Sequence, residues 1–397
     1  MRPRVHSTRP RCGRGNLVAH QHTKQDERQR AAHAGEAGPG SGQGNAFPLD
    51  LLAAASGRPA AWDGEAVDTT ETLGAVAHPG GLLVRRPELT VGVVRAVSRL
   101  SALEIELLAR RPLDRRGATE RQRDIRDGLS SGLEVAPRRL LPAYDEGMDL
   151  RAGLLDHTGR AHWEFATSHS SRSSSNSGPA HWFLFRFPPT FDQLSLVLAW
   201  PEIGFPETVI TMPLPDRPTV ERATASIWQA PLDVRPVPEG LTHHAHRHHR
   251  PPAIEAGTNA APLRVLHRGD HRVAVVLTRL TAVNSMLSME LLSIAKDEHA
   301  DAVNAQAFPG RRPTSGALDD PAQIRATGPG ASVAVVHGHE AFWIRPGDSS
   351  ASGGSQAFSS HQEFTLNRPH DDLLDLIVAW PLAGLPDVRV HLPLNPA

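Results

Sequence analysis

Histidine offers the plainest chemistry in this sequence, and it is concentrated in two segments. Neutral imidazole is a good ligand for zinc, nickel or copper, and alternate residues of an extended chain share one side. The first segment, HHAHRHH, is therefore a candidate metal site, but prolines bound it and no carboxylate accompanies it. A solvated linker is the alternative, and we favour it. The candidate ligands of this segment are His243, His244, His246, His248 and His249.

The second segment, VVHGHEAFW, contains His337, His339 and Glu340. If it forms a strand, its two imidazoles face the same way, as ligands do in some metal sites. A third ligand would have to come from another part of the fold, and the first half of the chain has no equivalent pair. Metal binding here stays a hypothesis, and we expect no cofactor.

The sequence contains no motif that is typical of a hydrolase or of a nucleotide-binding enzyme. The sequence has neither G-x-S-x-G nor a glycine-rich phosphate-binding pattern, although a catalytic triad, which is recognised by geometry, stays open. Asp371 and Asp372 are expected in a turn before a strand, not as the paired acids of a glycosidase. The arginine-rich segment LARRPLDRRGATERQRDIR also contains acids and lacks aromatic residues, so we expect no nucleic-acid binding.

Composition narrows the function classes further. The 397 residues include 42 Lys and Arg against 43 Asp and Glu, so no overall charge favours nucleic acid or a membrane surface. The one cysteine, Cys12, excludes an intrachain disulfide and a cysteine zinc site. No apolar stretch has the length of a membrane span, and no apolar segment follows the basic N-terminus as in a secretory signal. We expect a cytoplasmic protein that does not bind membranes.

One motif occurs twice, as LVLAWPEIGFPETVITMPLP and as LIVAWPLAGLPDVRVHLPLN, and Trp380 lies 180 residues after Trp200. Upstream, LEIELLA has a weaker counterpart in LSMELLS. A Ser- and Gly-rich segment, which we expect to be a loop, precedes each motif. Three features in the same order predict an internal duplication. The structural signature of the motif is Trp200, Pro201, Gly204 and Pro206, with Trp380, Pro381, Gly384 and Pro386 in the second copy.

The repeated motif has a physical interpretation. Alternate residues before each tryptophan are large and apolar, so they place one face of a strand against a core. Proline then ends the strand because it lacks an N–H, and glycine permits a bend that other residues resist. A second alternating strand follows. The motif therefore predicts two strands joined by a rigid corner, and its residues are expected to serve the fold and not a site.

These elements predict an all-β fold. Short strands separated by turn signals, without a long amphipathic helix, favour two tandem β-sandwich-like domains that arose by internal duplication. The predicted boundaries are a disordered or weakly structured region at 1–75, a first domain at 76–217, a Pro- and His-rich linker at 218–261 and a second domain at 262–397. The N-terminal tail and the linker are expected to be disordered.

The motif resembles one in a family of uncharacterised proteins from high-GC bacteria. Those proteins have a Gly- or Ser-rich loop followed by W-P-x-x-G-[ILF]-P-[ED] and then [TS]-R. Here the matching segments are AWPEIGFPETVI and AWPLAGLPDVRV, and they depart from the pattern at Val209 and Val388. The resemblance implies a β-rich domain and brings no activity with it.

The sequence therefore supports two functional hypotheses. The first is a non-catalytic binding or protein-interaction protein, whose partner would be a protein. The alternative is a hydrolase or metal-dependent enzyme with a site between the two repeats. A pocket where titratable groups of both repeats converge would favour the second, and an exposed apolar patch would favour the first.

Overall fold

A computed structural model describes the chain over residues 71–113, 118–126, 135–142, 149–174, 178–245, 252–307, 322, 325, 328–354 and 356–395. Residues 71–395 belong to one compact unit. The expected disorder of residues 1–70 lies outside the described residues. In the described part of the chain, no helix is both long enough and apolar enough to cross a membrane.

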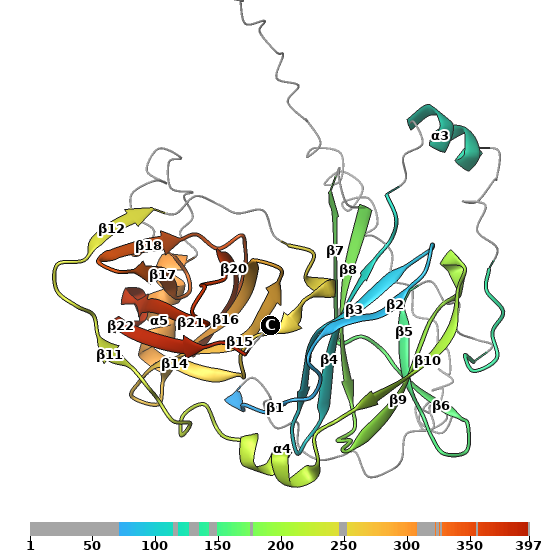
Figure 1. Ribbon diagram of the computed structural model, residues 1–397, viewed down its shortest axis with the longest axis horizontal. Helices are drawn as coiled ribbons and strands as arrows, with labels where there is room; N and C mark the ends of the chain where they lie inside the picture. Colours follow the sequence, from blue (N-terminus) through green and yellow to red (C-terminus); the bar gives the residue numbers. More distant parts are fainter. Residues whose placement is uncertain are drawn as a thin grey trace, which may run out of the picture. The chain divides into compact units, whose positions relative to one another are not determined.

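The first half of the described chain is built from two antiparallel sheets (Figure 1). The larger sheet has the order β1 (Ala75–Val76), β3 (Thr90–Ser98), β4 (Leu103–Arg110), β8 (Gly178–Phe187), β7 (Ser168–Ser174), with β2 (Gly81–Arg85) paired to β3. The smaller sheet has the order β10 (Phe205–Pro213), β9 (Gln193–Trp200), β5 (Arg151–Leu155), β6 (Ala161–Glu164).

The second half repeats this arrangement. Its first sheet has the order β13 (Thr258–Asn259), β15 (Val273–Val283), β16 (Met286–Lys296), β20 (Ala357–Asn367), β19 (Asp348–Gly353), with β14 (Arg264–Gly269) paired to β15. Its other sheet has the order β11 (Arg235–Pro236), β22 (Leu385–Pro393), β21 (Leu373–Trp380), β17 (Ser332–His337), β18 (Glu340–Ile344), β12 (Thr242–Ala245). The predicted all-β fold is confirmed.

Alternation along the strands builds a separate core in each half. Leu103, Ile105 and Leu107 of β4 point inward and pack against inward residues of β9. In the second half, Leu287 and Met289 of β16 do the same toward β21. The two sheets of each half thus share one apolar layer, and each fully buried large apolar side chain contributes about 1.5–3 kcal/mol.

The repeated motif forms the corner at one end of each sandwich. β9 ends at the buried Trp200, and the 3-10 turn η2 (Pro201–Ile203) follows before β10 begins. Gly204 has φ 77° and its counterpart Gly384 has φ 79°, the left-handed region that glycine enters at low cost. In the second half η4 (Pro381–Ala383) makes the same turn after the fully buried Trp380.

Three helices connect the strands in the described part of the chain. α3 (Ala118–Arg126) follows β4, and α5 (Asp297–Ala307) follows β16 at the matching place in the second half. α4 (Arg217–Ala223) follows β10, and the carboxylate of Asp216 accepts a hydrogen bond from the backbone N–H of Thr219 at its start.

The segment predicted to be a disordered linker is structured where it is described, and both of its predicted boundaries are wrong. Residues 218–223 continue α4, and β11 and β12 add strands to both edges of a second-half sheet. The 3-10 turn η3 (Ile254–Ala256) and β13 already belong to the second half. The apolar residues of the predicted linker explain why it is structured. Ile227, Val237 and Leu241 pack on sheet faces that would otherwise be exposed.

The predicted start of the first domain also needs correction, because the described structure begins before residue 76. Leu73 is buried against the second half, and Ala75 begins β1. Glu71 forms an ion pair with Lys296 at the end of β16 (2.5 Å). In return, Glu255 of η3 accepts two hydrogen bonds from Arg110 at the end of β4 (2.5 and 3.0 Å). The residue that leads into each half is therefore held by the other half.

Close backbone contact accompanies the second of these ion pairs. A Cβ placed on Gly92 of β3 would lie 2.0 Å from the carbonyl oxygen of Glu255. Only glycine at position 92 lets η3 lie directly on the outward face of β3.

We expect Trp200→Ala and Trp380→Ala to lower the free energy of unfolding by about 3–5 kcal/mol each, because each removes a buried indole from a sandwich core. Trp200→Phe keeps most of the buried area and should cost less. Urea denaturation of the full chain measures both effects. A tryptophan variant with wild-type stability would contradict the structural role of the corner.

We expect Gly92→Ala to lower the free energy of unfolding by about 1–3 kcal/mol, because the added methyl group overlaps the backbone of η3. Gly347→Ala is the matched control, since its Cβ would meet an atom at an ordinary 3.8 Å. Urea denaturation of the two variants provides the comparison. Equal stability of both would show that η3 does not lie against Gly92.

Candidate functional site

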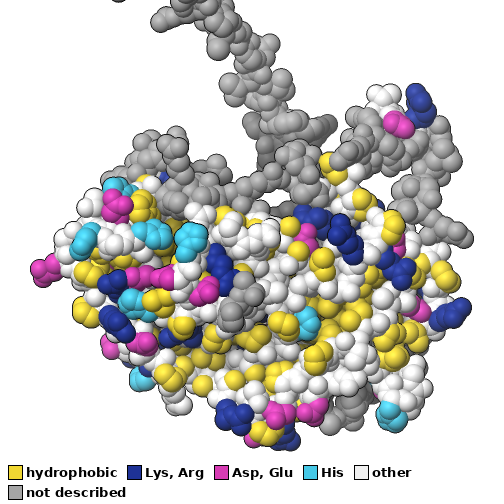
Figure 2. Space-filling model, in the orientation of Figure 1, with side chains coloured by type: hydrophobic (Ala, Val, Ile, Leu, Met, Phe, Trp, Pro, Cys, Tyr) yellow, Lys and Arg dark blue, Asp and Glu magenta, His cyan; other side chains and the backbone are white. Residues whose placement is uncertain are grey.

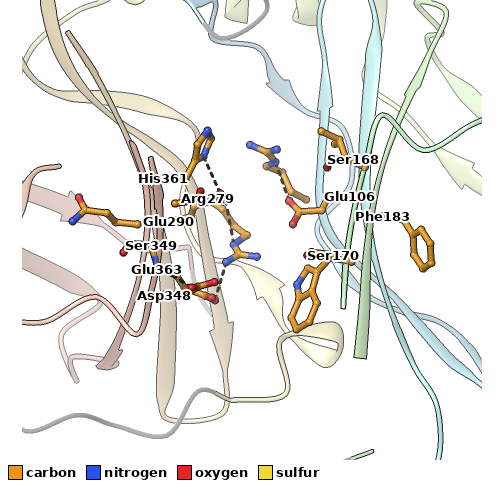
Figure 3. A pocket seen from close by; sticks show the side chains of 15 residues that line it. Glu106, Ser168, Ser170, Phe183, Arg279, Glu290, Asp348, Ser349, His361 and Glu363 are labelled. Atoms are coloured by element: carbon orange, nitrogen blue, oxygen red, sulfur yellow. Dashed lines mark hydrogen bonds and ion pairs between the residues drawn. The ribbon is translucent and has the colours of Figure 1, made fainter. Parts of the chain in front are cut away.

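A pocket of about 340 Å³ lies between the sheet of the first half that contains β3, β4, β8 and β7 and the sheet of the second half that contains β15, β16, β20 and β19 (Figure 3). Both halves line it, and six of the fifteen lining residues carry a charge. The first half contributes Arg95, Glu106, Ser168, Ser170, Trp182, Phe183 and Leu184. The second half contributes Arg279, Glu290, Asp348, Ser349, Ser350, His361, Gln362 and Glu363.

A β-bulge in each half aims an arginine at this pocket. In β3 the pairing with β4 shifts between Val93 and Arg95, and in β15 the pairing with β16 shifts between Leu277 and Arg279. Val93 and Leu277 point into the cores, so strict alternation would turn both arginines inward as well. The extra residue reverses their direction, as bulges beside functional sites do.

Each arginine stands opposite a glutamate on the neighbouring strand. Arg95 pairs in register with Glu106, and the shortest distance between them is 3.3 Å, from Nε to Oε2. Arg279 pairs with Glu290 in the same way, at 3.8 Å. These two pairs occupy matching places on the two walls of the pocket.

Beyond these pairs the two walls differ. On the second-half wall, Glu290 stands directly opposite Glu363 of β20, and Glu363 stands directly opposite Asp348 of β19. At the equivalent places of the first half, Glu106 stands opposite Leu184, which stands opposite Ser168. One wall therefore carries three carboxylates and the other only one.

Hydrogen bonds hold part of the second-half wall in place. Arg279 donates to Glu363 (3.0 Å), which also accepts from the hydroxyl of Ser288 (2.8 Å). His361 of β20 donates from Nδ1 to Glu290 (3.4 Å). The Arg279 side chain is only 5% exposed, so its charge is compensated by these carboxylates and hardly by water.

Several buried polar atoms of the lining residues make no hydrogen bond within the described residues. Oε2 of Glu106, Oε2 of Glu290 and Nε of Arg279 are three of them, and all three lie in the two ion pairs instead. These atoms therefore interact through charge, at distances longer than an ordinary hydrogen bond.

The two equivalent glutamates have pKa values shifted in opposite directions. Burial raises the pKa of Glu106, and the neighbouring charges of Glu290 and Glu363 add to the rise against the attraction of Arg95 and Arg279. Burial acts to raise the pKa of Glu290 as well, but the hydrogen bond from His361 and the charges of Arg95 and Arg279 outweigh it, so this pKa is lowered. The two equivalent carboxyl groups therefore differ in acidity, and Glu290 is the stronger acid.

The Ser- and Gly-rich segments, predicted to be loops, form the edge strands β7 and β19 instead. Pairing with β8 and β20 makes them strands despite their weak intrinsic preference. Their serines and Asp348 line the pocket. The Ser-rich composition of both segments indicated a shared role, but it did not indicate strands, because β7 and β19 are strands only through their pairing with β8 and β20.

The structure brings the two predicted histidine clusters to one place. β12 pairs in parallel with β18, so His243 and His244 lie beside the β17–β18 hairpin that carries His337 and His339. His243 accepts a hydrogen bond from the Trp343 indole (2.9 Å), and the His244 ring stacks on Phe342. His246, His248 and His249 lie outside the described residues. Histidines gather over this region in the view of Figure 2.

The described histidines of this region do not form a metal centre by themselves. No group of three or more His, Cys, Asp or Glu side chains in the described ranges is placed to hold a metal ion. The contacts that position His243 and His244 are instead aromatic, together with a 3.6 Å approach of His244 to Glu340.

The described lining of the pocket includes none of the signature residues of the repeated motif. The acid after each second proline anchors another segment. Glu207 accepts hydrogen bonds from the backbone N–H groups of residues 139–141, and Asp387 accepts from the guanidinium of Arg325. These acids therefore hold the chain that enters β5 or β17.

Comparison with known proteins leaves the family open. No family model matches the chain, and no curated protein matches it. Among solved structures, the chain is similar to a conserved domain protein from Bacillus anthracis, at 7% identity over 77% of this chain and 77% of that one, with a TM-score of 0.18. It is also similar to bovine butyrophilin, at 9% identity over 81% of this chain and 98% of that one, with a TM-score of 0.17. Likenesses this weak carry no argument about function.

The opposite pKa shifts predict opposite effects of two matched substitutions. The raised pKa of Glu106 means that the folded protein holds this proton more tightly, so the resulting stability is present at low pH and is lost as the pH rises. We expect Glu106→Gln to raise the free energy of unfolding at about pH 7 and to have little effect at about pH 3.

Glu290→Gln is the matched comparison. The lowered pKa of Glu290 gives stability that is present above the pKa of an ordinary glutamate and is lost as the pH falls. This variant should therefore lose stability at neutral pH and approach the wild type in acid. Urea denaturation between about pH 3 and pH 8 measures both. Shifts of the same sign at neutral pH would contradict the assignment.

Proposed function

We propose that this protein binds a small polar molecule in the pocket between its two halves. The observation that carries the proposal is the convergence of matching Arg–Glu pairs from both halves on a 340 Å³ space. Pockets of this size suit metabolite-sized ligands. The proposed activity is non-catalytic binding, with the ligand held by side chains on rigid strands.

Docking of the two halves does not by itself account for these charges. Elsewhere the contact between the halves includes apolar packing, as where Ile254 packs with Val94 and Leu108, together with the Glu71–Lys296 and Arg110–Glu255 ion pairs. Replacing a buried ion pair by well-packed apolar residues is often neutral or stabilising, so charges at the centre of the contact are a poor way to hold two domains together. Ligand recognition gives these residues a role that stability alone does not.

Acid–base catalysis in the same pocket is a second candidate, and the opposed pKa shifts of Glu106 and Glu290 favour it. A carboxyl group with a raised pKa suits a general acid, so a hydrolytic reaction would use Glu106 to protonate a leaving group. Glu290, whose pKa is lowered, would stay ionised and stabilise positive charge that develops in the reaction.

We also propose that the two halves arose by internal duplication. The equivalent sheets share their central strand order, the matching bulges fall before Arg95 and Arg279, and the corners at Gly204 and Gly384 have nearly the same φ. The His-rich segment would then be an addition to the second half, where it pairs through β12 with β18. A cytoplasmic location stays a prediction from the sequence.

A thermal-shift screen of the full chain tests the binding proposal. The probes are defined sets of primary amines, amino acids, sugars, nucleosides and carboxylic acids at millimolar concentration. Ser170→Trp places an indole at a pocket-lining position of the exposed edge strand β7, and Ser171→Trp places the same group at the neighbouring exposed position outside the pocket lining.

We expect at least one probe to raise the melting temperature of the wild type and of Ser171→Trp, but not of Ser170→Trp, because only the last variant fills the pocket. The proposal is wrong if no probe stabilises the wild type, or if every stabilising probe acts equally on Ser170→Trp. Turnover of a bound probe that is lost in both Glu106→Gln and Glu290→Gln would favour the catalytic candidate.

A further inference from the structure

The charged side chains of the pocket lining are compensated within the protein. Arg95 pairs with Glu106, and Arg279 pairs with Glu290 and with Glu363. The charges of both arginines act on Glu106 and on Glu290, so these four groups interact across the two halves. An ammonium or a carboxylate group brought to these pairs would meet a charge of its own sign beside the charge that attracts it. The pairs therefore favour a neutral ligand.

Exposed serine residues line the pocket on both walls. Ser168 and Ser170 of β7 share one face of the first-half sheet, and Ser350 belongs to β19 of the second half. Ser170 lies directly opposite Trp182 of β8, and at the matching place Ser350 lies directly opposite His361 of β20. Figure 3 shows Ser168 and Ser170 on the first-half wall of the pocket. Two edge strands from different halves thus place hydroxyl groups around one space.

Hydroxyl groups on a ligand match this mixture of polar groups. A hydroxyl both donates and accepts hydrogen bonds, whereas a carboxylate only accepts them and a guanidinium only donates them. The pocket combines all three types. A carboxylate has about four lone-pair sites, so it can accept from a ligand hydroxyl and keep its present partner. Asp348, for example, accepts from the backbone N–H of Ser349 (2.9 Å). Several hydroxyl groups can therefore bind without disturbing the ion pairs.

The first-half wall also has an apolar part, formed by Trp182 and Leu184 of β8. Trp182 packs against the apolar cluster that contains Leu108 and Ile254, which holds its indole in place. A saturated ring that carries hydroxyl groups presents C–H bonds on its faces and O–H bonds at its rim. A face of such a ring can pack on the indole while the rim bonds to the serines.

We propose that the ligand of this pocket is a neutral ring compound with several hydroxyl groups, a sugar or a cyclitol, which bonds to Ser168, Ser170 and Ser350 and packs its C–H face on Trp182. This inference rests on the proposed binding function and narrows it to one class of ligand. Organic cations and organic anions are the competing classes.

Calorimetric titration of the full chain with matched molecules tests the inference. The neutral probes are glucose, galactose, mannose, maltose and myo-inositol. Glucosamine and glucuronic acid add a positive or a negative charge to the glucose ring, and cyclohexanol keeps a six-membered ring with a single hydroxyl group. Each titration is made at low and at high sodium chloride concentration.

Matched variants separate the contributions of the two walls. Ser350→Ala removes a hydroxyl group at a lining position of β19, and Ser352→Ala removes the same group at an exposed position of β19 outside the lining. Trp182→Leu removes the indole and keeps an apolar side chain at this position. Ser170→Trp fills the pocket, with Ser171→Trp as its control. Melting temperatures show that each variant is folded, and the two β19 variants decide the outcome if Trp182→Leu does not fold.

We expect at least one neutral probe to bind more tightly than cyclohexanol and than both charged sugars, with an affinity that salt does not change. Ser350→Ala should weaken that probe by about two- to tenfold, the effect of losing one neutral hydrogen bond, and Ser352→Ala should leave it unchanged. Trp182→Leu should also weaken it, because the C–H face loses its aromatic partner. Ser170→Trp should abolish binding, and Ser171→Trp should retain it.

The inference is overturned if no neutral sugar or cyclitol binds, if glucosamine or glucuronic acid binds more tightly than every neutral probe, or if Ser350→Ala and Ser352→Ala have equal affinities. These results differ from failure of the binding proposal itself. An amine, a nucleoside or a carboxylic acid that stabilises the wild type but not Ser170→Trp would keep the pocket as a binding site and exclude the sugar.

Discussion

The pocket depends on one constraint, the extra residue that each bulge inserts before an arginine. A strand turns successive side chains to opposite faces, so an arginine two places after a core residue belongs in the core. The bulges before Arg95 and Arg279 break that rule once in each half. Both guanidinium groups then lie outside their own sandwiches, where only the other half of the chain can cover them. The Arg95–Glu106 and Arg279–Glu290 pairs on the two walls of the pocket follow from this change of direction.

The two sheets that line the pocket, one from each half, carry two kinds of residue on their outward faces. Toward their ends they carry apolar residues such as Leu108 and Leu292, which are buried by segments from outside their own sandwich. In the middle they carry the charged residues that surround the pocket. Reciprocal contacts through Glu71 and Glu255 resemble the isologous interface of a symmetric dimer, here made within one chain. Arg95 and Arg279 occupy equivalent positions of the two halves. Leu184 and Glu363 are also equivalent but differ in chemistry, so the two walls of the pocket differ.

Alternation and turn chemistry made the corners predictable from the sequence. Leu196, Leu198 and Trp200 share one face because of a period of two, and Gly204 and Pro201 identify the bend that follows. The pocket was not predictable in this way, because a bulge is a property of the pairing of two strands and not of either strand alone. The Ser-rich edge strands and β12 were missed for a related reason. Their structure comes from partners distant in sequence, which override weak local preference.

Because the chain is synthesised from its N-terminus, the contacts of Glu71 and Glu255 between the halves can form only after the second half has been made. Residues 90–217 leave the ribosome before Ile254 does, and Val94, Leu108 and Trp182 lie on the outer face that Ile254 covers. That face, and the charges of Arg95 and Glu106 beside it, stay open to water until a second domain of similar length has been made. During synthesis the first half therefore exposes apolar and charged residues that the folded chain covers, and chaperones or other copies of the chain can contact them at that stage.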